Sequence, residues 1–266
     1  MNVDEEAIRS RCTDAVFERG RTYRREGRVR RLQRFDDVVT AIVQGSSAYD
    51  VTVEFDDGID ARCTCPYDGP GECKHVVAVI LEVAVDEPRD ESKRVTAILE
   101  AVPAADLRAF VRETLAANPD VRDRFLARFG DDDTPVEKYR EEIEALFDQH
   151  TREYPVVTDA IDFSHFFDVA DQYRSRGRYL PAASVYRAVF EGIDDNEDRI
   201  DAAYDHYART LQSALEGYVE CVLAADLGQD EFEKYSGVLE EQAMSAHPAN
   251  SEQFYRAIDD LENRQS

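Results

Sequence analysis

The sequence predicts an α+β protein: a small N-terminal antiparallel β-meander with a cysteine-rich knuckle and flanking helices, followed by an all-α helical domain. Three observations support this prediction. Residues 28–55 alternate apolar and polar side chains with a period of two, whereas beyond residue 95 the apolar residues recur at helical spacing. Cysteines gather in residues 63–75. The 266 residues suffice for two domains, which we place at 1–88 and 95–266.

The first predicted helix spans residues 13–26. Thr13 or Asp14 can cap its N-terminus, and Gly27 can end it. Its apolar and small positions recur at helical spacing: Val16, Phe17, Gly20 and Tyr23.

Three strands are predicted next, at 28–35, 38–45 and 48–55, separated by short polar turns. Strands joined by such short turns predict an antiparallel meander. The turn "DDG" then leads into a fourth short strand, "DARCT", which delivers Cys63 and Cys65.

The rest of the chain is predicted to be helical. An apolar helix of about a dozen residues starts near His75, which suits a buried helix better than a membrane span. A polar linker follows at 86–94, and residues 95–129 contain two helical segments parted by "NPD".

Two later segments show the helical pattern best. Residues 201–223 keep one continuous apolar stripe. Residues 166–193 predict two helices joined at Gly177, similar to one tetratricopeptide-like helical hairpin, although no period of about 34 residues recurs.

The stretch "CTCPYDGPGECKH" carries the candidate metal ligands Cys63, Cys65, Cys73 and His75. Two cysteines two residues apart share one face of a strand, and a knuckle at Pro66 can bring both sulfurs to one ion. Cys73 and His75 would lie at the start of the apolar helix, whose dipole favours a thiolate. Thiolates and imidazole are zinc ligands, and a closed set of four leaves no position for a reactive water.

Two alternatives stand beside zinc: incidental cysteines, or a strained redox pair between Cys63 and Cys65. The absence of a signal-peptide pattern predicts a cytoplasmic protein, where clustered cysteines bind metals or catalyse more often than they form disulfides. Cys12 and Cys221 have no candidate ligands nearby in sequence and read as small buried residues.

This pattern resembles the SWIM zinc finger, whose signature is Cys-x-Cys, a variable spacer and Cys-x-His. SWIM proteins often carry an upstream segment of the form F-x-R-G-x-x-Y-x-x-G-x-V. The matching residues here, with one extra residue before the last glycine, are Phe17, Arg19, Gly20, Tyr23, Gly27 and Val29. The resemblance covers about residues 10–85. It implies bound Zn2+, contact with DNA or protein partners, and association with helicase-type ATPases, transposases or recombination factors.

The composition is strongly acidic, with 57 Asp and Glu against 32 Lys and Arg and a net charge of −25. Such dense acidity repels itself unless salt screens it. A chain that is rich in Asp, poor in Lys and free of Trp fits a halophile's cytoplasm. The alternative is a moderately acidic mesophilic protein.

One basic segment stands against this background: residues 19–34 hold eight arginines and a single acid, Glu26. The functional interpretation is that these arginines neutralise the phosphates of a bound nucleic acid. The alternative is pairing with the surrounding acids, and molar salt would weaken any phosphate attraction. The candidate nucleic-acid-binding residues are Arg19, Arg21, Arg24, Arg25, Arg28, Arg30 and Arg31.

The sequence contains no phosphate-binding loop, nucleophile elbow or HExxH motif, so we expect no enzyme. We expect a zinc-binding module that binds nucleic acid, in recombination or repair or with a helicase-type ATPase or recombinase, and does not act on membranes. The alternative is a protein-docking platform that binds no nucleic acid.

Overall fold

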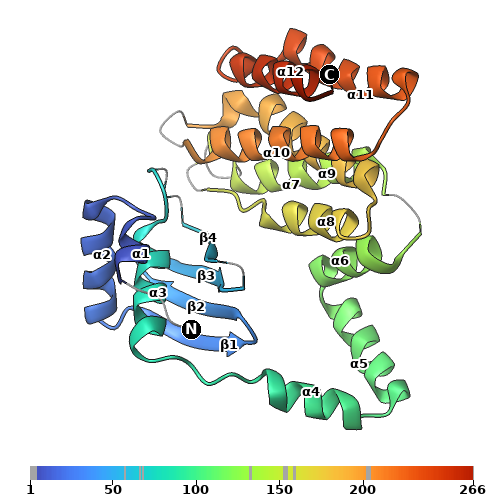
Figure 1. Ribbon diagram of the computed structural model, residues 1–266. Coiled ribbons are helices and arrows are strands. Elements are labelled where there is room, and N and C mark those ends of the chain that lie inside the picture. The colour runs from blue at the N-terminus through green and yellow to red at the C-terminus, as the bar shows by residue number, and fades with distance from the viewer. Residues whose placement is uncertain are drawn as a thin grey trace. The chain divides into compact units, whose positions relative to one another are not determined.

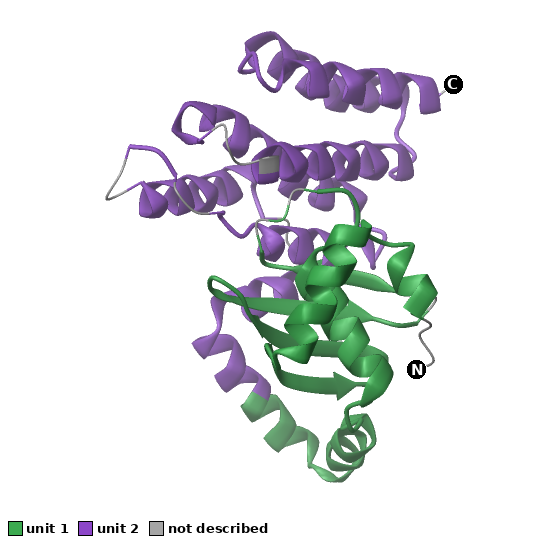
Figure 2. Ribbon diagram, turned by 90° about the vertical axis from the view of Figure 1, so that its left-hand side faces the viewer, with its two compact units in different colours: residues 1–110 green, residues 111–266 purple. Residues whose placement is uncertain are grey.

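The computed structural model describes residues 5–56, 58–65, 67, 69–131, 134–151, 155–157, 160–201 and 205–265. The chain divides into two compact units, residues 1–110 and 111–266, and the division falls inside helix α5 (Ala104–Ala117; Figure 2).

Unit 1 is built on one antiparallel sheet whose strands lie in the order β1-β2-β3-β4 (Figure 1). This order confirms the predicted meander. The elements of unit 1 before α5 are α1 (Glu5–Arg9), α2 (Asp14–Arg25), β1 (Val29–Phe35), β2 (Val38–Gln44), β3 (Ala48–Glu54), β4 (Asp60–Cys63), α3 (Lys74–Val85) and α4 (Ser92–Ala101).

One face of the sheet is buried. Val39 and Val43 of β2 and Val53 of β3 are 0% exposed and alternate with partly buried or exposed residues. Val39 lies opposite Val53, and Val43 lies opposite Val29 of β1. Because side chains alternate between the two faces, slipping the register by one residue would turn this apolar set toward solvent.

Helix α3 packs on that face, and Figure 1 shows α2 on the same side of the sheet. Most of α3 is buried, as expected of a helix that is apolar around its circumference. A Cβ on Gly20 of α2 would lie 2.4 Å from Cγ1 of Val77, so this glycine allows α2 and α3 to pack closely. No helix in the described part of the chain is long and apolar enough to cross a membrane.

Both predicted ends of α2 are confirmed. The Thr13 hydroxyl accepts a hydrogen bond from the backbone N–H of Val16 at 3.3 Å. Gly27 follows the helix at φ +61°, and the Arg28 N–H returns to the Tyr23 carbonyl at 3.1 Å. This is a Schellman-type ending, which favours glycine because of its left-handed backbone.

The helices up to residue 129 differ from the prediction in several places. The short helix α1 was not predicted, and residues 95–129 contain α4, α5 and α6 (Pro119–Phe129) instead of two helices. The unpredicted break is at Val102, which is extended (φ −75°, ψ 132°) before Pro103. A proline lacks the N–H that a helix needs and disfavours helical geometry in the residue before it. Helix α4 also starts inside the predicted linker, where the Ser92 N–H donates to the carboxylate of Asp90 at 2.9 Å.

The described part of unit 2 is mostly helical, as predicted. Gly177 has φ +69° and turns the chain between α8 (Ser164–Arg174) and α9 (Tyr179–Asp195), which confirms the predicted hairpin. Residues 202–204 of the predicted helix at 201–223 lie outside the described residues. The elements after α6 are α7 (Val136–His150), α8 (Ser164–Arg174), α9 (Tyr179–Asp195), a short 3-10 turn (Glu197–Arg199), α10 (Asp205–Ala224), α11 (Gln229–Ser245) and α12 (Ser251–Gln265).

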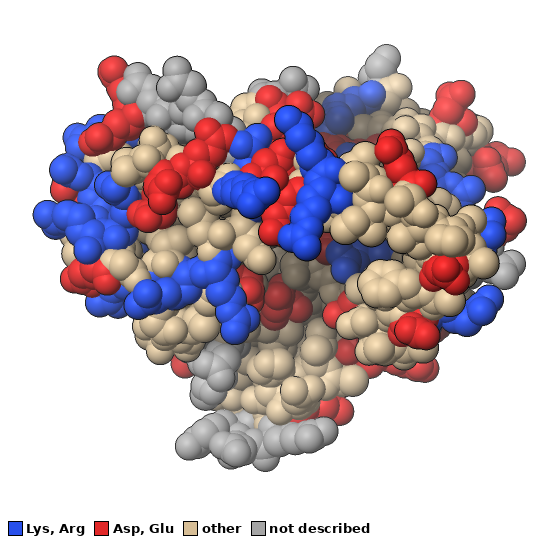
Figure 3. Space-filling view, turned by 90° about the horizontal axis from the view of Figure 1, so that it is seen from below, with Lys and Arg blue, Asp and Glu red and all other residues tan. Residues whose placement is uncertain are grey.

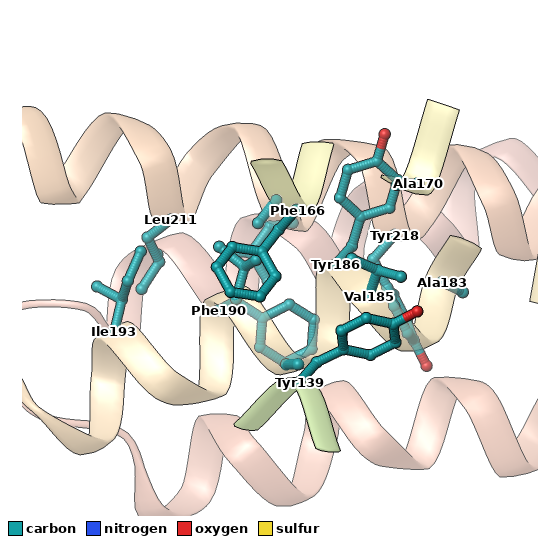
Figure 4. Packing of buried hydrophobic residues seen from close by; sticks show 14 of the residues in the cluster. Tyr139, Phe166, Ala170, Ala183, Val185, Tyr186, Phe190, Ile193, Leu211 and Tyr218 are labelled. Carbon is teal, nitrogen blue, oxygen red and sulfur yellow. The ribbon is translucent and has the colours of Figure 1, made fainter. Parts of the chain in front are cut away.

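Helix α9 lies at the centre of unit 2, packed against α7, α8 and α10. Figure 4 shows aromatic and aliphatic side chains of these four helices meeting in the space between them. The Phe190 ring lies 5.5 Å from Tyr218 and 5.7 Å from Phe254, nearly perpendicular to both. Such edge-to-face contacts add specific geometry to the burial of apolar area.

Candidate metal centre

Four side chains of unit 1 converge at the end of the sheet. Cys63 is the last residue of β4, Cys65 follows in the loop, Cys73 caps α3, and His75 lies in the first turn of α3. Their ligand atoms all lie within 4.8 Å of one another. The structure therefore brings together the four residues that the sequence singled out as ligands.

Pairing with β3 sets the direction of Cys63. This residue lies opposite Val51, which faces the core, and the next residue, Thr64, stays in register with Asp50. The Thr64 N–H donates to the Asp50 carbonyl at 3.1 Å, and the Asp50 N–H donates to the Thr64 hydroxyl at 3.0 Å. The predicted knuckle at Pro66 lies outside the described residues.

The N-terminal segment holds the far end of the loop. The Glu72 N–H donates to the Arg11 carbonyl at 2.8 Å, and Gly71 forms a β-bridge with Cys12. Gly71 has φ +72°, and a Cβ there would lie 2.2 Å from the Arg11 carbonyl oxygen. Only glycine fits this close approach without strain.

The Arg11 guanidinium strengthens the same connection. It donates to the Glu72 carboxylate at 3.1 Å and to the carbonyl of Ile59 in the turn before β4. Burial raises the pKa of Glu72, although the hydrogen bond from Arg11 acts in the opposite direction. Sequence reasoning missed Arg11, because nothing in its local sequence indicates a contact 61 residues away.

Cys73 lies at the start of α3, as predicted, and is the N-cap residue of this helix. Its sulfur accepts the backbone N–H of Val76 at 3.5 Å, and the residue is only 5% exposed. The first N–H groups of a helix and its dipole both favour a negative charge at this position. The location therefore suits a thiolate ligand.

The His75 imidazole is held between two aromatic rings. Its centroid lies 4.6 Å from Tyr49, nearly parallel, and 5.3 Å from Tyr23. Nδ1 lies 3.7 Å from the Cys63 sulfur, whereas Nε2 is buried and has no hydrogen-bond partner among the described residues. The ring is thus fixed by packing, with Nδ1 directed toward the sulfurs. Tyr49 falls in the strand predicted at 48–55, and sequence reasoning did not connect it with the metal site.

The donor set fits zinc. With Zn–S near ~2.3 Å and Zn–N near ~2.0 Å, neighbouring ligand atoms of a tetrahedral site lie roughly 3.5 to 3.8 Å apart, and the Cys63 to His75 distance falls in that range. Hydrogen bonds from Cys63 and Cys73 lower the pKa of Cys65 to about 3. The corresponding bond to Cys65 raises the pKa of Cys63. Thiols this close share protons, which a bound divalent cation would displace.

The upstream motif also supports the site. Phe17 is fully buried in the core of unit 1, Gly20 lets α2 approach α3, and Tyr23 packs on His75. Gly27 ends α2. Arg19 is exposed and contributes nothing visible to the site.

The two remaining cysteines do not belong to the ligand cluster. Cys221 is buried in unit 2, and burial raises its pKa to about 12. Cys12 is half-buried, and burial also raises its pKa. Neither thiol is activated as a nucleophile.

The seven predicted nucleic-acid-binding arginines fall into two groups. Three form ion pairs: Arg21 with Glu18 at 3.1 Å, Arg24 with Glu82 at 3.1 Å, and Arg28 with Glu26 at 2.5 Å. The other four are exposed and form no ion pair with any described residue: Arg19, Arg25, Arg30 and Arg31. Figure 3 shows basic side chains gathered on the left of the view, with acidic side chains among them. Nucleic-acid binding stays a prediction.

Three thiols and one imidazole, gathered from a strand end, the following loop and a helix N-terminus, define a zinc finger. Its type follows from comparison with known families, because residues 49–84 match the SWIM zinc finger. These residues are a SWIM zinc finger domain, and the match covers β4, the metal-binding loop and almost all of β3 and α3. No curated protein and no solved structure gives a significant match to the chain.

Proposed function

We propose that unit 1 is a nucleic-acid-binding module in which zinc holds the finger loop and unpaired arginines contact phosphates. The observation that carries this proposal is the set of four exposed arginines without an acidic partner among the described residues: Arg19, Arg25, Arg30 and Arg31. In a chain with 57 acidic residues, arginines that escape pairing are available to an external anion.

The strand arginines support the proposal by their positions. Arg30 lies opposite Ile42 on edge strand β1, and the register shifts between Arg30 and Gln33. Arg31 lies within this irregularity at φ +49°, an uncommon backbone conformation for a non-glycine residue. Bulges re-aim side chains at sheet edges. Here the bulge leaves two neighbouring arginines exposed.

The charge of unit 1 is also compatible with a polyanion. Residues 1–110 contain 16 basic and 22 acidic residues, whereas residues 111–266 contain 16 and 35. Unit 1 therefore repels a phosphate backbone far less than the net charge of the whole chain implies.

The test compares two triple variants that remove the same charge. Arg25, Arg30 and Arg31 are replaced by Gln in one protein, and the ion-paired Arg21, Arg24 and Arg28 in the other. We expect the first variant to lose affinity for duplex or single-stranded DNA to a similar extent whatever the base sequence of the DNA. Its dependence of log K on log salt should flatten by roughly one unit per lost contact. The variant that lacks the ion-paired arginines should show a smaller loss of DNA affinity and a smaller change in salt dependence.

Zinc content and circular dichroism must stay unchanged in both variants, since none of the six arginines is a metal ligand. Equal losses in the two variants would mean that only overall charge matters, and would contradict the assignment to the unpaired arginines. A neighbouring gene for a helicase-type ATPase or recombinase would support a role in recombination or repair.

Protein docking is the second candidate, favoured by exposed apolar side chains. Ile98 and Leu99 of α4 are 50% and 49% exposed, and Leu126 and Phe129 of α6 are 52% and 61% exposed. Such residues can anchor a protein partner. If the wild-type protein has no DNA affinity at the lowest salt that maintains the fold, docking becomes the preferred function.

A further inference from the structure

A second cluster of potential metal ligands lies in unit 2. Asp123 of α6, Glu142 of α7 and His165 of α8 each offer one ligand atom, and these atoms lie within 4.8 Å of one another. Their side chains are 17%, 34% and 21% exposed. Three helices thus direct two carboxylates and one imidazole toward one partly buried place.

The environment of His165 indicates room for an ion. Its Nε2 lies 3.8 Å from Oδ2 of Asp123, which exceeds the 2.7 to 3.2 Å typical of a hydrogen bond. Its Nδ1 is buried without a hydrogen-bond partner among the described residues. The ring packs edge-on against Phe166 at 5.4 Å. Packing, and not hydrogen bonding, therefore aims this imidazole at the carboxylates.

Lys138 shows that the two carboxylates accept a cation. Its Nζ lies 3.4 Å from Glu142 and 3.7 Å from Asp123, and its side chain is 49% exposed. A half-exposed lysine can withdraw into solvent because its stem is long and flexible. The nearby Arg124 pairs with Asp168 at 3.2 Å. Lys138 is thus the ammonium group that would compete with an ion.

We propose that Asp123, Glu142 and His165 bind a divalent transition-metal ion, with Lys138 as the competing cation. Two oxygens and one nitrogen form a harder donor set than the thiolates of the finger, so the site should accept Mn2+, whereas the finger selects zinc. An ion there would link α6, α7 and α8 and stabilise unit 2 by mass action.

The test uses the full chain with its finger loaded with zinc, in enough salt to screen the many surface carboxylates. Mn2+ is titrated, and free Mn2+ is measured by electron paramagnetic resonance. The matched pair is Glu142→Gln and Glu141→Gln, which remove the same charge at adjacent positions of α7, and Glu141 is exposed. We expect Glu142→Gln to weaken the tightest Mn2+ site by about tenfold or more, since loss of even a hydrogen-bonding partner of a ligand costs that much, and Glu141→Gln to leave it unchanged.

Two further variants separate a metal site from a simple ion-pair network. His165→Ala should also weaken Mn2+ binding, and Lys138→Met should tighten it, because the competing ammonium is gone. Zinc content should stay the same in all four variants. Equal Mn2+ affinity in Glu142→Gln and Glu141→Gln, or no tightening in Lys138→Met, would overturn the proposal and leave the cluster as an ion-pair network.

Discussion

The two units of this chain differ in what holds them together and in how they carry charge. Unit 1 has a small core on one face of a four-stranded sheet and a metal centre beside it. Unit 2 has a large core rich in aromatic side chains. Residues 111–266 hold 35 of the 57 acidic residues but only half of the basic ones. The acidity thus belongs mainly to the helical unit, whereas the whole arginine-rich segment, residues 19–34, belongs to the finger unit.

This difference indicates how each unit is stabilised. A small domain buries a low fraction of its surface and often needs a metal or a disulfide. Unit 1 follows that rule, since its four ligands tie β4, the loop and α3 to one point. Unit 2 buries a large apolar core that can stabilise it without a metal. Repulsion among its acidic side chains lowers that stability.

The largest expected effect is loss of unit 1 when zinc is removed. A chelator should increase hydrogen exchange throughout β1 to β4 and α3, because metal affinity is coupled to folding of this unit. Exchange in α9 and α10 should stay slow. Segment-resolved hydrogen exchange by mass spectrometry measures both, and Cys73→Ala should give the same pattern without chelator. Rapid exchange in α9 on chelation would show that the two units unfold together.

A core substitution should produce the opposite pattern. Phe190→Ala removes a fully buried ring of unit 2 and should lower its free energy of unfolding by about 3 to 5 kcal/mol. Denaturant titration followed by circular dichroism measures this change. The zinc content should not change. The control is Met244→Ala, whose side chain is 79% exposed and whose loss should change little. Equal destabilisation by both would contradict the packing described for α9.

A smaller effect is expected at the far end of the metal-binding loop. Gly71→Ala places a Cβ against the Arg11 carbonyl at φ +72°, which should destabilise unit 1 by about 1 to 3 kcal/mol. The measurement is the free energy of unfolding of the zinc-loaded protein. Gly228→Ala is the matched control, because nothing lies within 4 Å of a Cβ there. If Gly71→Ala is as stable as the wild type, the backbone around Arg11 can move away from the new Cβ without loss of stability, which would contradict this prediction.

The smallest effect concerns salt. If the composition reflects adaptation to a salty cytoplasm, added salt should raise the thermal midpoint of unit 2 more than that of unit 1, because unit 2 has the greater excess of acids. A calorimetric scan across a salt series of the zinc-loaded protein measures both transitions. Maximal stability in dilute buffer would contradict the halophile hypothesis.

The features predicted correctly from the sequence are those encoded locally. In β3, the buried Val51 and Val53 alternate with the polar residues Asp50, Thr52 and Glu54, and this alternation sufficed to predict the strand. The ligands lie within thirteen residues, so residue type and spacing were enough to find them. Gly27 and Gly177 were correct as helix ends for the same reason.

The features that were missed depend on residues far apart in sequence. Asp123, Glu142 and His165 come from three helices, and no local pattern brings them together. The pairing of Arg24 with Glu82 likewise exists only because α2 packs on α3. Helix α1 is too short to show periodicity, since Ile8 is its one buried residue.

The bridge between Cys12 and Gly71 affects how fast the finger can exchange its ion. The loop is closed twice, once by the four ligands and once by the backbone contacts to Arg11 and Cys12. A chelator needs two ligands to swing away together, and the second closure holds the loop in place while any single ligand dissociates. Rebinding is then faster than escape. We therefore expect the ion to leave at a rate set by opening of the N-terminal segment, a kinetic barrier that the ligand set alone would not provide.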